Sequence, residues 1–409
     1  MRVLFVSHMA TRSGAPLLLL WLLRWLMAQK RGIEPAVVLL SDGPLRPDFE
    51  ALAPTEAWSR PLFQPLRERV AARLGRGRAA SPAELLEGAV QRHRPELIYL
   101  NTLVLGQHLR GLAADPARPA CLSHVHELET TLATMSSPEA VARQLSMSSV
   151  VVACAEGVRQ SLHTHHGLPL QRCTVIPGFL PYAAPGQGQP PPETLPGEPT
   201  SLEPALEPAL EPLEAALAAG TFVFGFAGQA ITRKGFDLFP LLVKECERVF
   251  AGQPFLAVWL GASPGQEPVL MARRDLQLLG LEHRALLLPP MPSAIGVIGR
   301  FAVHGLLSRE DPYPLVALEA AASAVPTICF EGGGGIVDFV ADGCGLAVPY
   351  LDLAAFAAGL HRLSNDPDSR RRLGERSRAR VWRESGIDDV APRLLACMER
   401  AVAAGPHHG

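Results

Sequence analysis

Lysine is nearly absent from this sequence. It occurs only at Lys30, Lys234 and Lys244, and all the other basic residues are arginine. The 38 basic residues are balanced by 40 acidic residues, which leaves a formal net charge of −2. The chain therefore lacks the positive balance that is typical of proteins whose main partner is nucleic acid.

Cysteine pairs are missing too. The seven cysteines are scattered along the chain, their number is odd, and no two of them form a Cys-x-x-Cys pair. This distribution argues against a disulfide framework and against a structural zinc site. We therefore expect free thiols in a reducing compartment, the cytoplasm, and no metal site.

The sequence also lacks a hydrophobic run long enough to cross a membrane. The most membrane-like segment, residues 15–28, has 14 residues and is interrupted by Arg24, whereas a transmembrane helix needs roughly 18. No clear cleavage site follows it, so we expect no signal peptide. The segment instead predicts a helix that is buried in the core.

What the sequence does contain is a regular succession of short apolar runs, separated by helix-like segments. The length of 409 residues suggests two or three domains. Runs that are apolar on both faces and alternate with helices predict parallel sheets that are covered on both sides. The runs lie at 3–7, 36–40, 97–101, 149–154, 222–228, 255–261, 285–290, 302–308, 326–330 and 345–349.

Residues 181–218 separate the two halves of this pattern. The segment is rich in Pro, Gly and Glu and contains LEPALEPALEPLEAAL. Because proline interrupts helices, a long regular helix is not expected here, and we predict an extended, solvated linker or insertion. The prediction is thus an N-terminal α/β domain at 1–180 and a C-terminal one at 219–385, with a ligand cleft between them.

The segment SREDPYPLVALE at 308–319 places a carboxylate in an apolar helix. Pro314 suits the first turn of that helix, and Asp311 or Ser308 is a candidate cap for it. At about 100° per residue, Glu319 falls inside the apolar arc of the helix. We therefore expect Glu319 to be buried.

A buried Glu319 needs partners, because burying an unpaired carboxylate costs on the order of several kcal/mol. A structural role would be an arginine salt bridge or a helix cap, and a functional role would be to accept hydrogen bonds from the hydroxyls of a ligand. Asp311 follows an apolar run, and α/β proteins bind ligands at the carboxyl ends of parallel strands. We therefore pair Asp311 with Glu319 as candidate ligand-binding residues and expect Glu310 to be solvated.

The segment GFAGQAITRKGFDLF also follows an apolar run. Gly228 allows the backbone to approach a ligand, and Arg233 and Lys234 are adjacent cations that suit a diphosphate. The alternative interpretation is ordinary surface charge.

The segment EGGGGIVDFVADGCG follows the apolar run at 326–330. Its glycines, among them Gly333, Gly334 and Gly335, expose consecutive N–H groups that suit anionic oxygens. A plain flexible loop is the alternative.

Two segments of the N-terminal half are candidates as well. In SHVHELE, His124 and His126 share a face if the segment is a strand. The two histidines could bind a metal, but the sequence offers no clear third ligand. The remaining interpretations are that the histidines are packed in the core or cap a helix, or that one of them lies at a strand end in a ligand cleft. The segment SHMATRSGAPLLLL reads as a strand, a loop with Gly14 and Ala15, and the start of a helix. This arrangement would direct free N–H groups at an anion or a reaction centre. A simple turn is the alternative.

These segments together resemble the retaining glycosyltransferases of family 4, which have the GT-B fold of two Rossmann-like domains that face a cleft. SREDPYPLVALE is similar to the acid-x7-acid segment of the family, in which a Glu-Pro-Phe-Gly loop precedes a helix that carries a Glu. Asp311 stands where the family has its first Glu, and Pro314 stands where it has Gly. The resemblance implies that Glu319 holds the nucleotide ribose and that Asp311 lies near the donor sugar.

The glycine segments resemble two further loops of the family. Lys234 takes the lysine position of the diphosphate-binding loop, whose usual Gly-Arg pair is Gly228–Gln229 here. The glycines at 333–335 resemble a Gly-Gly-x-x-Glu loop, with Asp338 in place of Glu. The resemblance implies that their amides face the phosphates or the sugar of the donor.

The N-terminal segments resemble the acceptor side of the family. His126 resembles a histidine near the donor sugar, and Gly14 and Ala15 fit the first loop, which lines the acceptor side. By analogy, the C-terminal segment 386–409 is a helix that crosses back to the N-terminal domain. The basic segment 362–382 is either a solvated surface or a contact to anionic lipid at the inner membrane face.

The resemblance implies a hexosyltransferase-type enzyme that moves a sugar from a UDP- or GDP-sugar to a glycan or lipid-linked acceptor, with retention, in cell-surface polysaccharide biosynthesis. The nucleotide-sugar is a co-substrate, and no cofactor or metal is expected, because Arg233, Lys234 and the glycine amides would stabilise the departing diphosphate. His126 and Asp311 complete the candidate catalytic set. The alternatives are a catalytically degenerate nucleotide-sugar-binding module, which the missing arginine motivates, and a GT-B nucleotide-sugar 2-epimerase.

Overall fold

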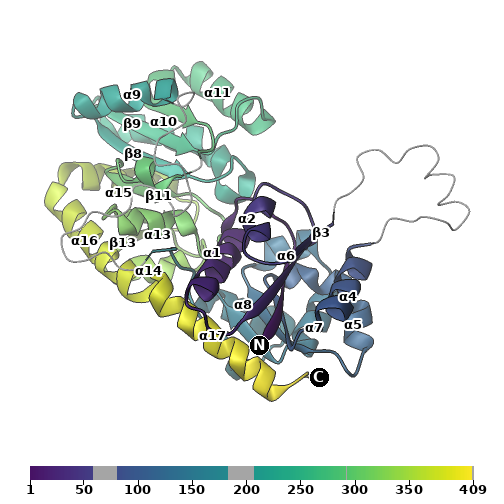
Figure 1. The fold of residues 1–409 in the computed structure, drawn as a ribbon. Coiled ribbons are helices and arrows are strands. Elements are labelled where there is room, and N and C mark those ends of the chain that lie inside the picture. Colours follow the sequence, from purple (N-terminus) through teal and green to yellow (C-terminus); the bar gives the residue numbers. More distant parts are fainter. Residues whose placement is uncertain (59–80, 183–206, 292, 408–409) are drawn as a thin grey trace, which may run out of the picture. The chain divides into compact units, whose positions relative to one another are not determined.

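A computed structural model of the chain describes residues 1–58, 81–182, 207–291 and 293–407. The chain divides into two compact units (Figure 1). Unit 1 contains Met1–Pro177 and Val390–Gly409, and unit 2 contains Gly178–Asp389. Each unit is built around one parallel sheet.

The sheet of unit 1 has the strand order β3-β2-β1-β4-β5-β6-β7, and all its neighbouring strands are parallel. The order reverses between β1 and β4, and such a reversal creates the crevice in which doubly wound α/β sheets bind ligands. The strands are β1 (Arg2–Ser7), β2 (Glu34–Leu39), β3 (Thr55–Ala57), β4 (Leu97–Leu100), β5 (Ala120–Val125), β6 (Val150–Ala153) and β7 (Cys173–Val175).

Helices cover this sheet, and one face packs on α4, η1, α5 and α7. The elements are α1 (Gly14–Ala28), α2 (Arg46–Glu50), α4 (Pro82–His93), η1 (Leu103–His108), α5 (Arg110–Ala114), α6 (Glu129–Met135), α7 (Pro138–Met147), α8 (Glu156–His166), η2 (Leu170–Arg172) and the greater part of α17 (Ile387–Ala404). The last helix joins the β7 edge, because Arg393 donates to the carbonyl oxygen of Val175 at 3.1 Å and Arg400 to Thr174 Oγ1 at 3.3 Å.

The apolar segment at 15–28 is a buried helix, as predicted. Helix α1 buries six of its seven leucines and both of its tryptophans, Trp21 and Trp25. Its single charged residue, Arg24, lies at the half-exposed side and pairs with Asp48 Oδ1 at 2.6 Å. In the part of the chain that the structure describes, no helix is both long enough and apolar enough to cross a membrane.

The sheet of unit 2 has the strand order β10-β9-β8-β11-β12-β13, again with parallel neighbours, and the order reverses between β8 and β11. The strands are β8 (Phe222–Ala227), β9 (Phe255–Leu260), β10 (Ala285–Leu288), β11 (Val303–Leu306), β12 (Thr327–Phe330) and β13 (Gly345–Val348). All ten predicted apolar runs coincide with strands of the two sheets, which confirms the predicted α/β class with two parallel sheets.

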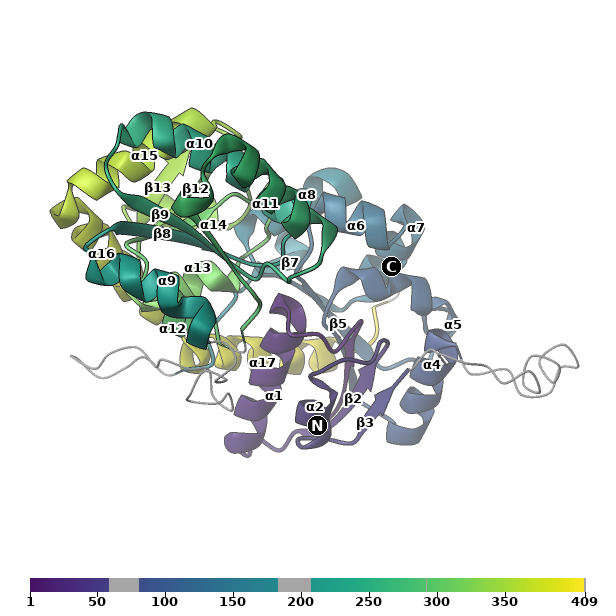
Figure 2. The ribbon, with the colours of Figure 1, turned by 90° about the horizontal axis from the view of Figure 1, so that it is seen from above.

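Helices lie on both faces of the second sheet. The core on one face includes α10, α11 and α15, and the core on the other includes α9, α12 and α13 (Figure 2). The elements are α9 (Glu207–Ala218), η3 (Thr232–Lys234), η4 (Phe236–Leu238), α10 (Phe239–Phe250), α11 (Glu267–Leu279), η5 (Glu282–Arg284), α12 (Ile295–Ile298), α13 (Leu315–Ala322), α14 (Ile336–Ala341), α15 (Leu353–Asn365) and α16 (Pro367–Glu384).

An aromatic core fixes the loop that follows β8. The Trp259 ring stacks on Phe226 with centroids 5.5 Å apart and meets Phe236 edge-on at 4.8 Å. Trp259 also donates its indole N–H to the carbonyl oxygen of Gly228 at 3.0 Å. The buried tryptophan thus provides both apolar packing and a polar contact, and it holds the start of the loop in place.

The expectation of an extended, solvated segment at 181–218 is wrong for its last twelve residues. Residues 183–206 lie outside the described residues, but Glu207–Ala218 form α9. The helix buries Leu210 and Leu213 against one face of the second sheet. The repeat that places prolines four residues apart also places leucines where they reach a core, and this burial outweighs the cost of Pro212 within the helix.

All seven cysteines are free and buried, as the scattered spacing predicted. Burial raises the pKa of the Cys121 thiol to about 12, and the same cause raises that of Cys329 to about 12. These thiols stay protonated at neutral pH and act as small apolar groups in the core.

Candidate functional site

The predicted site residues fall into two sets. Unit 2 holds Gly228, Arg233, Lys234, Asp311, Glu319 and the glycines at 333–335, and unit 1 holds Gly14, Ala15 and His126. In unit 2, the loops after β8, β11 and β12 carry the set, and these three strands are neighbours in the sheet. Because parallel strands end at the same edge, residues more than a hundred positions apart meet there.

Lys234 and Asp311 form an ion pair at this edge. The Lys234 ammonium donates to Asp311 Oδ2, and the side chains are only 18% and 6% exposed. Ser308 donates its hydroxyl to the same oxygen at 3.3 Å. Sequence reasoning selected both residues but did not predict that they neutralise each other.

The cap proposed for the following helix is absent. Pro314 occupies the N-cap of α13, one residue before the first turn, and no side chain caps the helix there. Asp311 instead directs its carboxylate to Lys234 and its backbone to the next loop, where its N–H donates to the carbonyl oxygen of Gly333 at 2.8 Å. An accessible cation stabilises a buried carboxylate more than helix N–H groups that lie several residues away.

Arg233 also has partners within the protein. Its Nη1 donates to the carbonyl oxygen of Glu310 at 2.8 Å, and the N–H of Arg309 donates back to the Arg233 carbonyl oxygen at 2.9 Å. Glu310, which we expected to be solvated, is half-buried. The two adjacent cations are therefore tied to the loop that carries Asp311.

Arg309 was not predicted as a site residue. Its guanidinium makes a bidentate pair with Asp237 at 2.7 and 2.8 Å and also donates to the carbonyl oxygen of Thr232 at 2.6 Å. These contacts clamp the loop after β8 to the loop after β11. An Arg next to an acidic pair was the only signal in the sequence, and the partner Asp237 lies 72 residues away.

Two glycines are required by the close approach of these loops. At Gly235, with φ +76°, a Cβ atom would lie 2.0 Å from the carbonyl oxygen of Leu307. At Gly334, with φ +126°, it would lie 1.8 Å from that of Asp311. A side chain at either position would push Lys234 or Asp311 out of place. The glycines therefore allow the two loops to approach each other because they have no Cβ atom.

The glycine loop offers fewer open N–H groups than the sequence predicted. Gly333 donates to the carbonyl oxygen of Phe330 at 3.2 Å, and Gly335 donates to that of Pro312 at 3.1 Å. The prediction of consecutive open amides at 333–335 is therefore wrong for these two. Gly334 pairs with Asp311 in a parallel bridge, so the loop serves first to hold the acidic loop.

Glu319 is buried, as the helical wheel predicted. It is 5% exposed and lies in α13, whose residues are otherwise Leu, Val and Ala. The helix follows directly on the loop that carries Asp311. The site therefore contains two buried carboxylates, of which Asp311 is the one with the lysine partner.

His304 lies buried in β11 and was missed in the sequence. Its Nδ1 lies 3.2 Å from Thr327 Oγ1 of the neighbouring strand. Burial, followed by the nearby Lys234 ammonium, lowers the pKa of His304 to about 3. The ring is therefore neutral at all physiological pH values.

In unit 1, a cluster of three histidines lies where β1 and β5 end. The rings of His124 and His126 have centroids 4.0 Å apart, and Tyr99 contacts His124 Nδ1 at 2.6 Å. Burial lowers the pKa of His126 to about 3, with a smaller contribution from His8, whose own pKa is lowered by burial to about 4. These rings are neutral and can donate or accept hydrogen bonds.

For His124 and His126 the sequence offered no clear third metal ligand. Among residues 1–58, 81–182, 207–291 and 293–407, no three His, Cys, Asp or Glu side chains are arranged to hold a metal ion. Two other predicted residues of unit 1, Gly14 and Ala15, begin α1, and the Ala15 carbonyl oxygen accepts from Asn101 Nδ2 at 2.8 Å. This contact ties the helix start to the loop after β4.

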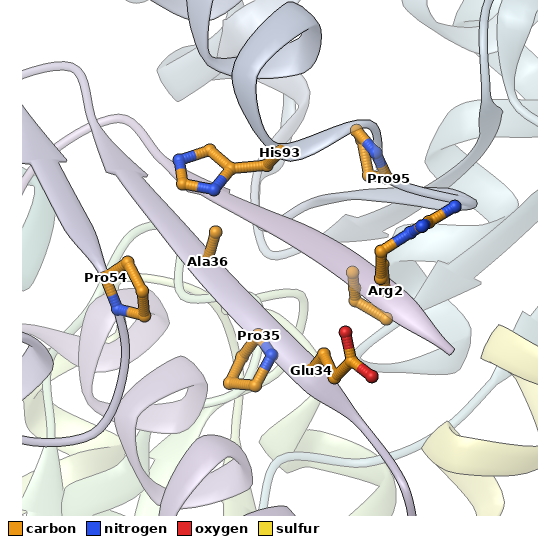
Figure 3. A pocket seen from close by; sticks show the side chains of 8 residues that line it. Arg2, Glu34, Pro35, Ala36, Pro54, His93 and Pro95 are labelled. Carbon is orange, nitrogen blue, oxygen red and sulfur yellow. The ribbon is translucent and has the colours of Figure 1, made fainter.

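A cavity of about 210 Å³ in unit 1 lies away from these residues. Figure 3 shows Arg2, Glu34 and His93 among its lining side chains. Arg2 and Glu34 begin β1 and β2, so the cavity is at the amino ends of the strands. Ligands of parallel sheets bind at the opposite edge, and we do not assign the cavity to the site.

Comparison with known proteins finds a family match for part of the chain. Residues 214–380 match the family model described as glycosyl transferases group 1. These residues form a glycosyl transferases group 1 domain. The domain contains every candidate residue of unit 2, from Gly228 to Gly335.

A curated relative covers a similar share of the chain. The D-inositol 3-phosphate glycosyltransferase of Nocardia farcinica (strain IFM 10152) is 29% identical over 170 residues, which are 40% of this chain. The match spans 37% of the length of that relative. Sequence similarity to this relative thus extends over less than half of either chain.

Solved structures extend the comparison to the whole chain. Anabaena Alr3699/HepE in complex with UDP has a TM-score of 0.74 at 19% identity, covering 98% of this chain and 100% of that one. Sucrose-phosphate synthase from Thermosynechococcus elongatus has a TM-score of 0.73 at 18% identity, covering 99% and 100%. These likenesses show that the group 1 domain and unit 1 together have the GT-B fold.

Proposed function

We propose that this protein is a retaining glycosyltransferase that uses a nucleotide-sugar donor. The observation that carries the proposal is the convergence of Lys234, Asp311 and the glycine loop at the carboxyl edge of the sheet in the group 1 domain. A cation beside a carboxylate suits a sugar diphosphate, because the cation meets the phosphates and the carboxylate meets the sugar hydroxyls.

In the proposed reaction, the bond between the anomeric carbon and the diphosphate oxygen breaks, and the nucleoside diphosphate leaves. The acceptor hydroxyl attacks the same face of the sugar, and the leaving phosphate accepts its proton. Lys234 and Arg233 stabilise the charge that develops on the leaving oxygen. Asp311 orients Lys234 and accepts hydrogen bonds from the donor sugar.

Glu319 is proposed to bind the nucleotide ribose. Its carboxylate is buried in an apolar helix, and ribose hydroxyls are suitable donors for a buried carboxylate. No metal is required in this scheme, because the two cations balance the diphosphate. The proposed donor is a UDP- or GDP-sugar, and structures of the Anabaena protein with UDP and with UDP-glucose support the first of these.

In unit 1, we propose that His126 contributes to the reaction and that Gly14 and Ala15 lie on the acceptor side. His126 Nε2 has no hydrogen-bond partner among the described residues, and the ring is neutral. A neutral imidazole nitrogen can donate to or accept from a hydroxyl group, and this is the role that we propose for Nε2 when the acceptor binds. The proposed acceptor is a glycan or a lipid-linked glycan of a cell-surface polysaccharide, made at the cytoplasmic side of the membrane.

One observation favours a second candidate, a binding module without turnover. Gln229 is exposed where the family usually has an arginine, and Lys234 is already neutralised by Asp311. A diphosphate would then meet less positive charge than in an active transferase. Such a module would bind a nucleotide-sugar and leave it intact.

Thermal unfolding across UDP-, GDP- and ADP-sugars tests the donor first, because a ligand that binds the native state raises the melting temperature. The stabilising donor is then incubated with candidate acceptors, and the anomeric proton coupling of the product is read by NMR. We expect the anomeric configuration of the donor in the product. An inverted product contradicts the retaining mechanism, and an unchanged donor favours the binding module.

A further inference from the structure

Glu127 is a buried carboxylate next to His126 that the proposed reaction has not used. It is 6% exposed and lies just after β5. Both of its oxygens accept hydrogen bonds from the protein. Oε1 accepts from the Thr102 hydroxyl, and Oε2 accepts from the N–H of Leu103 at 3.0 Å and from the N–H of His126 at 3.1 Å.

These contacts join two loops of unit 1. Thr102 and Leu103 follow β4, His126 and Glu127 follow β5, and the two strands are neighbours. Thr102 is itself fixed, because Gln144 donates to its carbonyl oxygen at 2.7 Å. Glu127 therefore connects the backbone at His126 to a rigid part of the core.

The charged form of this carboxylate is costly to bury. Burial raises the pKa of Glu127, and the hydrogen bonds from Thr102, Leu103 and His126 oppose that rise. An apolar residue would avoid the cost of burial but would leave two backbone N–H groups without an acceptor. The carboxylate is thus explained by the loops that it holds together.

We infer that Glu127 is a positioning residue that sets the place of His126 in the proposed transfer reaction. It accepts a hydrogen bond from the backbone N–H of His126, and the His124 ring packs on the imidazole with the two centroids 4.0 Å apart. The inference rests on the proposed function. Glu127 does not touch the reacting atoms in this scheme, and its effect on the rate passes through His126.

Substitution of Glu127 tests the inference through two variants. In Glu127→Gln, the amide oxygen can take the place of Oε2 and keep both backbone bonds, while the amide nitrogen faces the Thr102 hydroxyl. In Glu127→Ala, all three hydrogen bonds are lost. We expect Glu127→Ala to lower kcat about tenfold to a hundredfold at saturating donor, because small displacements of a reacting group have effects of this size. Glu127→Gln should keep most of the activity.

A double-mutant cycle separates positioning from a general loss of structure. Both substitutions are repeated in the His126→Ala background, with kcat expressed per folded protein. If Glu127 acts through His126, Glu127→Ala has no further effect there. The inference is overturned if the two losses multiply, if Glu127→Gln loses as much as Glu127→Ala, or if Glu127→Ala keeps full activity.

Thr102→Val keeps the test decisive if Glu127→Ala does not fold. It removes one of the three donors and keeps the shape of the side chain. We expect a smaller loss of kcat that also disappears in the His126→Ala background. A loss that persists in that background overturns the inference.

Hydrogen exchange distinguishes failure of the inference from failure of the proposed function. The amides of Leu103 and His126 donate to Glu127, so both should exchange faster in Glu127→Ala and at wild-type rates in Glu127→Gln. If no donor is turned over by the wild-type chain, the proposed function fails while this result still shows whether Glu127 holds the loop. Unchanged exchange in Glu127→Ala contradicts the positioning role whatever the activity.

Discussion

Lys234 Nζ donates to Asp311 Oδ2, and this ion pair joins two loops whose residues are 77 positions apart in the sequence. The pair is mostly buried and lies where β8 and β11 end. It gives the lysine a fixed position and gives the carboxylate a counter-ion. Both features suit a site that receives a sugar diphosphate, because the cation is held in place before the ligand arrives.

The first prediction concerns the stability of this pair. Lys234→Met leaves Asp311 buried beside an apolar side chain, and we expect the free energy of unfolding to fall by about 3 kcal/mol. Asp311→Asn should cost less, because the longer Lys234 side chain can reach water. Urea unfolding of the two single variants and the double variant measures the coupling.

We expect the double variant to be more stable than Lys234→Met alone, because it contains no buried unpaired charge. Arg248→Met is a suitable control, since Arg248 is 66% exposed and pairs only at the surface. Strict additivity of the two substitutions would show that the pair does not hold the loops together.

The second prediction concerns Glu319. Glu319→Gln should lower donor affinity by about tenfold or more, because a hydrogen bond to a charged acceptor is lost. The free energy of unfolding should stay the same, because glutamine has nearly the same shape and volume as glutamate. Isothermal titration with the stabilising nucleotide and urea unfolding measure the two quantities, with the exposed Glu267→Gln as control. Unfolding of the variant with normal residual donor affinity would instead assign Glu319 a structural role.

The third prediction compares two glycines of one loop. Gly334→Ala places a Cβ atom against the carbonyl oxygen of Asp311. We expect the free energy of unfolding to fall by at least about 3 kcal/mol and donor binding to be lost. Gly332 also has a positive φ, +73°, but no atom lies within 4 Å of its added Cβ. Gly332→Ala should therefore cost only about 1 to 2 kcal/mol and keep donor binding. Equal effects of the two substitutions would show that the contact between the loops is not important.

The fourth prediction concerns acid stability. The pKa of His304 is lowered to about 3 in the folded protein, whereas the unfolded chain takes up a proton near pH 6.5. Since the unfolded state binds more protons between these values, stability is present above pH 6.5 and is lost as the pH falls. His304→Gln should reduce this loss by about 1.4 kcal/mol per pH unit.

Urea unfolding at several pH values between 7.5 and 5 measures the effect. His165→Gln is the control, because His165 is exposed. Equal pH dependence in wild type and His304→Gln would mean that the ring is not held neutral in the folded chain.

The apolar runs predicted most of the two sheets because a strand buried on both faces leaves a strong signal. Three of the described strands gave no such run. The edge strands β3 and β7 have only three residues each, and the apolar pattern of the interior strand β5 is interrupted by Ser123 and His124. Helix α9 was missed because proline spacing dominated the pattern, although Leu210 and Leu213 supply the buried face. Short edge elements and proline-containing helices depend on contacts with distant residues, which a local pattern does not contain.

A site residue could be predicted from the sequence where its burial is costly whatever its neighbours are. Glu319 is unexpected in any apolar helix, so its burial followed from the sequence. The pairing of Lys234 with Asp311 depends on two loops that meet only in the folded sheet. Glu127 follows His126 in the sequence, whereas its partners Thr102 and Leu103 come from the segment after the neighbouring strand β4. Sequence patterns thus identified candidate site residues, whereas the partners of these residues became known only from the folded structure.

The most direct test of the proposed transferase is release of nucleoside diphosphate from the stabilising nucleotide-sugar, measured for the wild-type chain and for Lys234→Met in the presence and absence of acceptor. We predict release by the wild-type chain, faster with acceptor, and at least about a hundredfold slower release by Lys234→Met, because a cation at the leaving group is lost. Tight binding of the donor without any release of nucleoside diphosphate by the wild-type chain would contradict the account.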